Sequence, residues 1–328
     1  MASSIWPWVA FNAFVVLMLA VDLGVFNRRA HVIGMKEAAR FSIITALLAL
    51  GFAGALAARL LPIENVGGHR HALEFLTGYL IELALSVDNI FVFVLIFSYF
   101  QVPAKYQHRV LYWGVLGALL MRGAMIGAGA ILIDRFHWII YAFGAFLVFT
   151  GIRMAVHDEV NIAPESNPAL RLVRRLVPIS SGYDGQKLFT HEKVGDRVRR
   201  VATPLFVVLV LVETTDLLFA VDSIPAIFAV TRDPFLVYTS NVFAILCLRS
   251  LYFLLAGVID TFHYLKLGLS GVLVFIGGKM LATAFHYHVS IGISLGVVAA
   301  LLGASIAASL IWPKPPEERR EDAPGPPA

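Results

Sequence analysis

Charged residues are scarce in this sequence. They make up 15% of its 328 residues, while 59% are hydrophobic and the mean hydropathy is +0.78. A soluble domain of ordinary composition carries about 25% charged residues. The deficit excludes an ordinary soluble domain and indicates a chain whose main solvent is lipid.

The sequence also has a single cysteine, Cys247, which lies in an apolar run. One cysteine excludes a disulfide within the chain and a cluster of thiolate metal ligands. We expect Cys247 to be a small packing residue. A nucleotide-binding loop, a nucleophile motif and the HExxH pattern of zinc hydrolases are missing as well. We therefore expect neither an enzyme nor an ATP-driven pump, and no resident cofactor.

Nine stretches are long and apolar enough to cross a bilayer, for which about 20 mostly apolar residues suffice. The sequence therefore predicts an all-α, polytopic membrane protein with about nine transmembrane helices. The first stretch is predicted to be a retained helix, because it lacks a basic segment before it and is followed by Arg28 and Arg29. The nine stretches are 4–26, 41–61, 72–100, 108–133, 136–154, 203–231, 235–259, 266–285 and 290–312.

Two polar segments lie outside these stretches. The connection 155–202 is rich in arginine, and we expect its basic runs to lie at anionic lipid headgroups rather than on nucleic acid. The tail 313–328 has almost nothing to bury and is predicted to be disordered.

The Lys and Arg residues predict the orientation of the helices. Nine spans put nineteen of them on one side of the membrane and five on the other, with Arg122 and Arg249 inside spans. Cytoplasmic loops carry the excess of Lys and Arg. We therefore expect a multi-pass protein of a bacterial inner membrane, with its N-terminus outside and its C-terminus in the cytoplasm.

The sequence contains a duplication. Residues 82–90, ELALSVDNI, align with residues 216–224, DLLFAVDSI, at an offset of 134. Further along, at offsets of 127 and 126, Arg122 aligns with Arg249, and LVFTGIRM at 147–154 aligns with LVFIGGKM at 273–280. Each copy holds three spans, and an odd number of spans ends on the opposite face from its start. The two copies are therefore predicted to be inverted repeats, an architecture of many secondary transporters.

The duplication predicts how the chain is divided. We expect two helices outside the repeats, a first repeat, a basic cytoplasmic loop, a second inverted repeat, a final helix and a disordered tail. In the same order, these segments are 1–71, 72–154, 155–202, 203–285, 286–312 and 313–328.

Both repeats carry acids into the bilayer, where ionisable groups cost several kcal/mol and face protein or water. The first has Glu82, Asp88 and Asn89, and the second has Glu213, Asp216, Asp222 and Ser223. Acids six residues apart differ by about 9 Å in depth and about 120° in direction, so they form a ladder of oxygen sites.

Pro225 adds a further oxygen to this ladder. It has no amide hydrogen, so the carbonyl of Val221 loses its helical donor beside Asp222, and the helix is expected to kink. Carboxylate, hydroxyl and carbonyl oxygens suit Mg²⁺, Ca²⁺ or Mn²⁺. These acids have two interpretations: they pair with Arg122 and Arg249 to hold helices together, or they bind cations or protons. Five acids against two arginines leave an excess of three, which favours cations or protons.

The motifs ELALSVDNIFVF at 82–93 and VETTDLLFAVDSIPAIFAVT at 212–231 resemble the signature segments of the TerC family of bacterial integral membrane proteins. The resemblance covers roughly residues 5–312. It implies a manganese exporter with a layout similar to that of LysE-like exporters. The intramembrane acids and amides of the family fall on Glu82, Asp88, Asn89, Glu213, Asp216, Asp222 and Ser223.

Two hypotheses follow. In the first, a secondary transporter exports Mn²⁺ through oxygens of Asp88, Asn89, Asp222, Ser223 and the Val221 carbonyl. Glu82, Asp216 and Glu213 would then relay the ion or exchange protons for it. In the second, the chain is a tellurium- or stress-resistance scaffold that acts with partner proteins through 155–202. The expected partners are a divalent cation, protons and lipid, with no nucleic acid; the sequence leaves open a homo-oligomer or membrane partners.

Overall fold

The structure is a computed structural model. It describes residues 5–21, 33–61, 63, 66–136, 138–156, 170–171, 173, 175, 177–180, 182–194, 197–256, 264–285, 287 and 289–312. Within these ranges the side chains of Val21, Asp88, Lys193, Val194, Arg197, Val198 and Ala284 are not described. The tail that the sequence predicts to be disordered, 313–328, lies outside the described residues.

The described residues form nine long α-helices, which confirms the all-α prediction. Eight of them are long and apolar enough to cross a membrane, and α1 is shorter. The helices are α1 (Trp6–Val21), α2 (Met35–Ala57), α3 (His69–Tyr99), α4 (Ala104–Arg135), α5 (Ile139–Val156), α7 (Pro204–Phe228), α8 (Pro234–Leu255), α9 (Leu265–Ala282) and α10 (Ile291–Ile311).

Local chemistry sets several of the helix ends. The Asp233 side chain accepts hydrogen bonds from the backbone N–H groups of Phe235 and Leu236, and Pro234 fills the first helical position, where its missing N–H costs nothing. Ser290 caps α10 by accepting from the N–H of Ile293. Helix α7 continues through Pro225 to Phe228, although that proline leaves one carbonyl without its helical donor.

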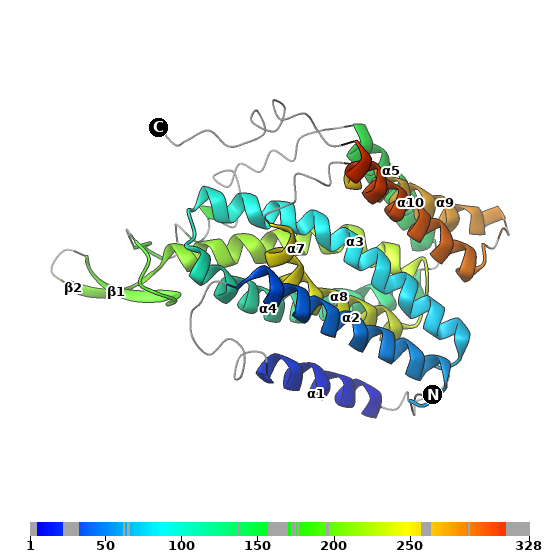
Figure 1. Ribbon diagram of the computed structural model, residues 1–328, viewed down its shortest axis with the longest axis horizontal. Coiled ribbons are helices and arrows are strands. Elements are labelled where there is room, and N and C mark those ends of the chain that lie inside the picture. The colour runs from blue at the N-terminus through cyan, green and yellow to red at the C-terminus, as the bar shows by residue number, and fades with distance from the viewer. Residues whose placement is uncertain are drawn as a thin grey trace.

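The connection 155–202, predicted as a basic loop, contains two β-strands in its described part. Its second half forms an antiparallel hairpin of β1 (Phe189–Val194) and β2 (Arg197–Ala202), with Phe189 paired to Ala202 and His191 to Arg200. Figure 1 shows the hairpin extending beyond the bundle along the direction of the helices rather than across it. We therefore call this end of the molecule the hairpin end and the opposite one the far end.

Helix α8 lies at the centre of the bundle. It packs against α2, α3 and α4, and 89% of its most apolar stretch is buried. Helices α1 and α2 cover one side, whereas α5, α9 and α10 form a separate group on the other (Figure 1). This arrangement places α3 and α7 next to each other in the middle of the molecule.

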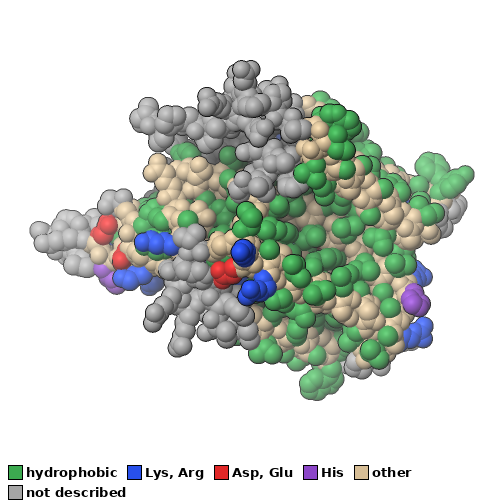
Figure 2. All heavy atoms as spheres, in the orientation of Figure 1, with side chains coloured by type: hydrophobic (Ala, Val, Ile, Leu, Met, Phe, Trp, Pro, Cys, Tyr) green, Lys and Arg blue, Asp and Glu red, His purple; other side chains and the backbone are tan. Residues whose placement is uncertain are grey.

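On the face that Figure 2 shows, hydrophobic side chains cover much of the described bundle, while Lys and Arg residues lie on the hairpin, in one group nearer the middle of the view and, with a His residue, at the far end. Large apolar side chains such as Leu47, Leu120 and Phe149 are more than half exposed. Apolar exposure of this extent suits lipid, not water.

Helices α5 and α9, the third helices of the two repeats, make a close contact through small residues. A Cβ atom added to Gly277 would lie 2.6 Å from the carbonyl oxygen of Gly144, and one added to Gly151 would lie 2.8 Å from that of Ser270. At the repeat offset of 126, Gly144 is equivalent to Ser270, and Gly151 to Gly277. The two contacts are therefore the same contact made twice, as a two-fold relation between the repeats requires.

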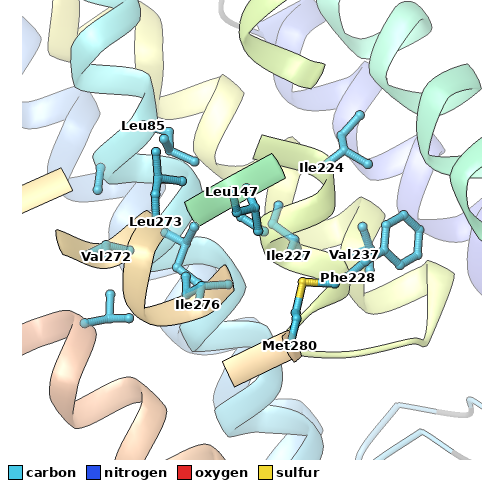
Figure 3. Packing of buried hydrophobic residues seen from close by; sticks show 14 of the residues in the cluster. Leu85, Leu147, Ile224, Ile227, Phe228, Val237, Val272, Leu273, Ile276 and Met280 are labelled. Carbon is cyan, nitrogen blue, oxygen red and sulfur yellow. The ribbon is translucent and has the colours of Figure 1, made fainter. Parts of the chain in front are cut away.

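The apolar core beside this contact follows the same relation. Leu147 and Leu273 are equivalent positions of the duplication, and Figure 3 shows both in the same cluster, with Ile276 and Met280 of α9 and Ile227 of α7.

Candidate functional site

A buried ion-pair cluster lies at the centre of the bundle. The Arg122 guanidinium on α4 donates from Nε to Asp216 Oδ2 at 3.0 Å and from Nη2 to Asp216 Oδ1 at 2.7 Å. Its Nη1 donates to Glu82 Oε1 on α3. Arg122 and Glu82 are 1% or less exposed, and Asp216 is 3% exposed. One arginine thus joins an acid of each repeat, with a bidentate pair to the second.

Helices α3 and α7 run antiparallel, and two hydrogen bonds fix their register. Asn89 Nδ2 donates to Asp216 Oδ1 at 3.4 Å, a long hydrogen bond, and Thr231 Oγ1 donates to Glu74 Oε2 at 2.8 Å. Seven residues before Asn89 on α3 is Glu82, and seven residues after Asp216 on α7 is Ser223. The register therefore puts Glu82 opposite Ser223.

This register obeys the duplication. At the offset of 134, Glu82 is equivalent to Asp216 and Asn89 to Ser223. The Asn89–Asp216 contact and the Ser223–Glu82 juxtaposition are thus two copies of one arrangement. Only the first copy is closed by a hydrogen bond among the described residues.

Several buried oxygens in this region have no hydrogen-bond partner among the described residues. The three on α3 belong to residues spaced four and three apart, which puts them on one face of the helix. An unsatisfied buried polar group costs about 1–3 kcal/mol, so a set of them indicates space for a ligand, protons or water. The oxygens are Glu82 Oε2, Ser86 Oγ and Asn89 Oδ1 on α3, and Glu213 Oε2 and Ser223 Oγ on α7.

The structure brings together some of the predicted residues and separates others. Arg122 binds both Glu82 and Asp216. Asn89 donates to Asp216, and Ser223 lies opposite Glu82. Val221, in contrast, has a 46% exposed side chain on the outer surface of α7, and Asp222 beside it is only partly buried. The side chain of Asp88 lies outside the described residues.

The predicted centre at Asp88 and Asp222 is thus not the centre of the cluster that the structure describes. Among described residues, no group of three His, Cys, Asp or Glu side chains is positioned to hold a metal ion. The cluster instead has arginine where a bound cation would compete for the same carboxylates.

A pocket beside the cluster involves the second repeat's arginine. Asp216 and Arg249 both line it, together with Gly114 and Ala118 of α4 and Ile245 of α8. The Arg249 guanidinium also lies over the Phe41 ring, 5.4 Å from its centroid.

Three buried polar residues of α3 and α8 were missed in the sequence. Ser86 lies one turn from Glu82 on the same face, a spacing that could have revealed it. Asn241 on α8 is fully buried, and neither amide atom has a partner among the described residues. Glu74, at the far end of α3, is 4% exposed and accepts from Arg70 Nε at 3.0 Å as well as from Thr231.

The sequence is similar to those of known proteins over most of its length. Residues 67–317 match the model of the integral membrane protein TerC family. The chain is 51% identical over 317 residues to "Uncharacterized membrane protein STKORF319" of Myxococcus xanthus, covering 97% of this chain and 96% of that protein.

It is 50% identical over 297 residues to "Putative membrane-bound redox modulator Alx" of Escherichia coli K12, with 90% and 91% of the two chains covered. An "Uncharacterized membrane protein" of Rickettsia felis is 38% identical over 306 residues, 93% of this chain and 97% of that one. No solved structure matches. The resemblance inferred from the two motifs is confirmed, and the chain belongs to the TerC family of integral membrane proteins.

Proposed function

We propose that the chain is a secondary transporter that exports divalent metal cations, with Mn²⁺ as its main substrate, in exchange for protons. The observation that carries the proposal is the buried acid cluster between the repeats, whose oxygens are only partly paired. Inverted repeats that meet at buried ionisable groups suit alternating access, in which one repeat rocks against the other.

The charges of the cluster support cation binding. Glu82, Asp216 and Glu213 carry three carboxyl groups, and Arg122 is the cation that pairs with two of them. Leaving such charges buried is expensive unless a proton or a cation compensates them. A divalent cation between Glu82 and Asp216 would supply the missing charge.

The chemistry of the oxygens supports a hard cation. A cation that displaced Arg122 would find carboxylates on both helices, with Asn89 Oδ1 and Ser223 Oγ as neutral ligands. Six or more oxygen ligands with some waters are usual for Mg²⁺, Ca²⁺ and Mn²⁺. The choice of Mn²⁺ rests on what the family resemblance implies. Asp88, Asp222 and the Val221 carbonyl remain proposed contacts along the path.

The direction of transport rests on the charge bias. If the hairpin end faces the cytoplasmic side of a bacterial inner membrane, the excess of Lys and Arg lies on that side. The cation would enter from the hairpin end and leave at the far end.

Cation flux in proteoliposomes tests the proposal. Purified protein should move Mn²⁺ faster than Mg²⁺, Ca²⁺ or Zn²⁺, and an opposing pH gradient should accelerate it. Asp216→Asn and Glu82→Gln should abolish the flux, while Asp134→Asn, at an exposed acid near the end of α4, should not. If wild-type protein that is confirmed to be inserted in the liposome membrane moves none of these cations, the proposal is wrong.

A second candidate function comes from the name of the Escherichia coli relative, redox modulator. In that case the chain would act as a stress-response scaffold, and its hairpin would be the contact surface. A variant in which a short linker replaces β1 and β2 separates the two ideas. Loss of stress resistance with unchanged cation flux would favour the scaffold. If the variant loses neither, the hairpin is not the contact surface of a scaffold.

A further inference from the structure

Glu213 differs from the other acids of the cluster in how it is held. It lies on α7, three residues before Asp216 and therefore on the same face. A Cβ atom added to Gly117 of α4 would coincide with the Glu213 carboxyl group. The missing side chain of Gly117 thus makes the slot that this carboxyl occupies.

No Lys or Arg of the described part of the chain forms an ion pair with Glu213, whereas Glu82 and Asp216 share Arg122 and Glu74 has Arg70. Glu213 Oε2 is inaccessible and has no hydrogen-bond partner among the described residues. A buried carboxylate without a counter-charge is strongly disfavoured, whereas the neutral acid is tolerated.

The elements packed against α7 carry other charged groups. Asp216 lies three residues beyond Glu213 on α7 itself. Arg122 and Arg109 lie on α4, five and eight residues from Gly117, and Glu82 lies on α3. The other elements that contact α7 carry Arg153 at the exposed end of α5, Lys266 in the first turn of α9, Arg199 and Arg200 of β2, and Arg249 of α8, which shares a pocket with Asp216.

Glu213 also lies close to the bundle surface. Leu217, one turn further on α7, is 38% exposed, and Leu120, three residues beyond Gly117 on α4, is 78% exposed. A small apolar reagent dissolved in the bilayer can therefore approach this part of α4 and α7.

We propose that Glu213 is the proton-carrying group of the transporter, separate from the carboxylates that bind the cation. This inference rests on the proposed function and assigns its coupling step. When a cation binds at Asp216, its charge favours loss of the Glu213 proton to water on the open side. When the cation leaves, Glu213 takes a proton from water on the other side. One O–H bond is broken and one is formed in each cycle, with no other reactant.

Labelling with a hydrophobic carbodiimide tests the protonated state without any transport. The O–H of a protonated carboxyl group adds across a C=N bond of the carbodiimide, and the adduct can be located by mass spectrometry of the full chain after digestion. Glu213 should be labelled, less so as pH rises and less so with Mn²⁺ present, and Glu213→Gln should lose that adduct. No labelling of Glu213 at low pH, or labelling that neither pH nor Mn²⁺ changes, would overturn the inference.

Flux measurements test the coupling. In proteoliposomes, Glu213→Gln should lose the acceleration of Mn²⁺ flux by a pH gradient. If wild-type protein moves no cation, the proposed function fails, whatever the labelling shows. If wild-type protein is driven by the pH gradient and Glu213→Gln is driven equally, only the proton assignment fails.

The glycine slot provides a second test. Gly117→Ala should displace the carboxyl and reduce carbodiimide labelling and proton coupling together, and the shorter side chain in Gly117→Ala/Glu213→Asp should restore both. Gly127→Ala on the same helix, where a Cβ meets nothing within 4 Å, is the matched control. Unchanged labelling in Gly117→Ala, or no rescue in the double variant, would count against the slot.

Discussion

Two of the helix pairs through which the repeats meet have opposite character. Helices α5 and α9 meet through glycines whose backbones nearly touch, as at Gly144 and Gly277. Helices α3 and α7 meet through acids, an amide and hydroxyls, several without partners. Both interfaces follow the same two-fold relation, so the sequence of each repeat encodes a packing surface and a polar surface at once.

The difference indicates which interface is rigid. Close-packed small residues leave no alternative arrangement, because any shift brings backbone atoms into collision. A polar interface with unpaired oxygens can exchange partners at modest cost. We therefore expect α5 and α9 to hold the repeats together while α3 and α7 change their contacts.

The largest expected effect is at Arg122. Arg122→Gln removes the one cation shared by Glu82 and Asp216, and breaking a buried pair in this way costs about 3–5 kcal/mol. The midpoint of thermal unfolding in detergent should fall strongly. Arg70→Gln is the control, since the Arg70 side chain is 78% exposed and Glu74 keeps its hydrogen bond from Thr231 without it. Equal unfolding of Arg122→Gln and wild type would mean that the cluster is not held by charge.

The next effect concerns the glycine interface, where two adjacent glycines give a matched pair. Gly277→Ala places a methyl group 2.6 Å from a backbone oxygen of α5, whereas the same change at Gly278 meets nothing within 4 Å. Overpacking costs about 1–3 kcal/mol, so Gly277→Ala should unfold earlier and Gly278→Ala should not. If both variants unfold like wild type, α5 and α9 are not the rigid interface.

A third prediction separates stability from function at the polar interface. Ser223 Oγ has no partner among the described residues, so Ser223→Ala should leave stability unchanged or raise it by about 1 kcal/mol, while Mn²⁺ flux falls. Ser305→Ala is the contrast, because its hydroxyl donates to the Leu302 carbonyl at 2.8 Å and lies away from the cluster. It should lower stability slightly and leave flux intact. Reduced stability in Ser223→Ala would show that its hydroxyl is satisfied after all.

The smallest effect is expected in the hairpin, which belongs to neither interface. Hydrogen bonds from Thr190 Oγ1 at 2.6 Å and Lys187 Nζ at 3.0 Å hold the pKa of Asp184 below its ordinary value. A carboxyl group whose pKa is lower in the folded state stabilises that state at pH values above its ordinary pKa. This stabilisation is lost as pH falls through the folded-state pKa. The protection factors of the hairpin amides, that is, the intrinsic exchange rates at each pH relative to the observed rates, should therefore fall in acid, and less so in Asp184→Asn. An acid response of the same size in the two interfaces would contradict this separation.

The helices could be predicted from the sequence because a spanning segment needs a long apolar run, and such runs are visible without any tertiary information. The predicted spans overlap all nine helices, with ends that differ by several residues, as at 41–61 against Met35–Ala57. The hairpin was missed because its strands carry basic residues on both faces, which hides the alternation of an ordinary strand.

The sequence predicted most of the residues of the site, but not which of them lie at its centre. Residues seven apart lie within about 20° on a helix, whereas residues six apart differ by about 120°. That spacing pairs Glu82 with Asn89 and Asp216 with Ser223, and it turns Asp222 away. Arg122 and Arg249 are equivalent positions of the duplication, so the sequence alone does not show which of them pairs with both acids. That choice depends on side-chain packing.

The reciprocal glycine contact between α5 and α9 has a consequence for how this protein arose. Before duplication, Gly144 and Gly277 would have belonged to two copies of a half-sized protein that faced each other in opposite orientations. Such a protein must insert into the membrane both ways, which requires almost no charge bias. The predicted bias of nineteen Lys and Arg residues to five would then postdate the fusion of the two genes, when a single insertion direction became useful.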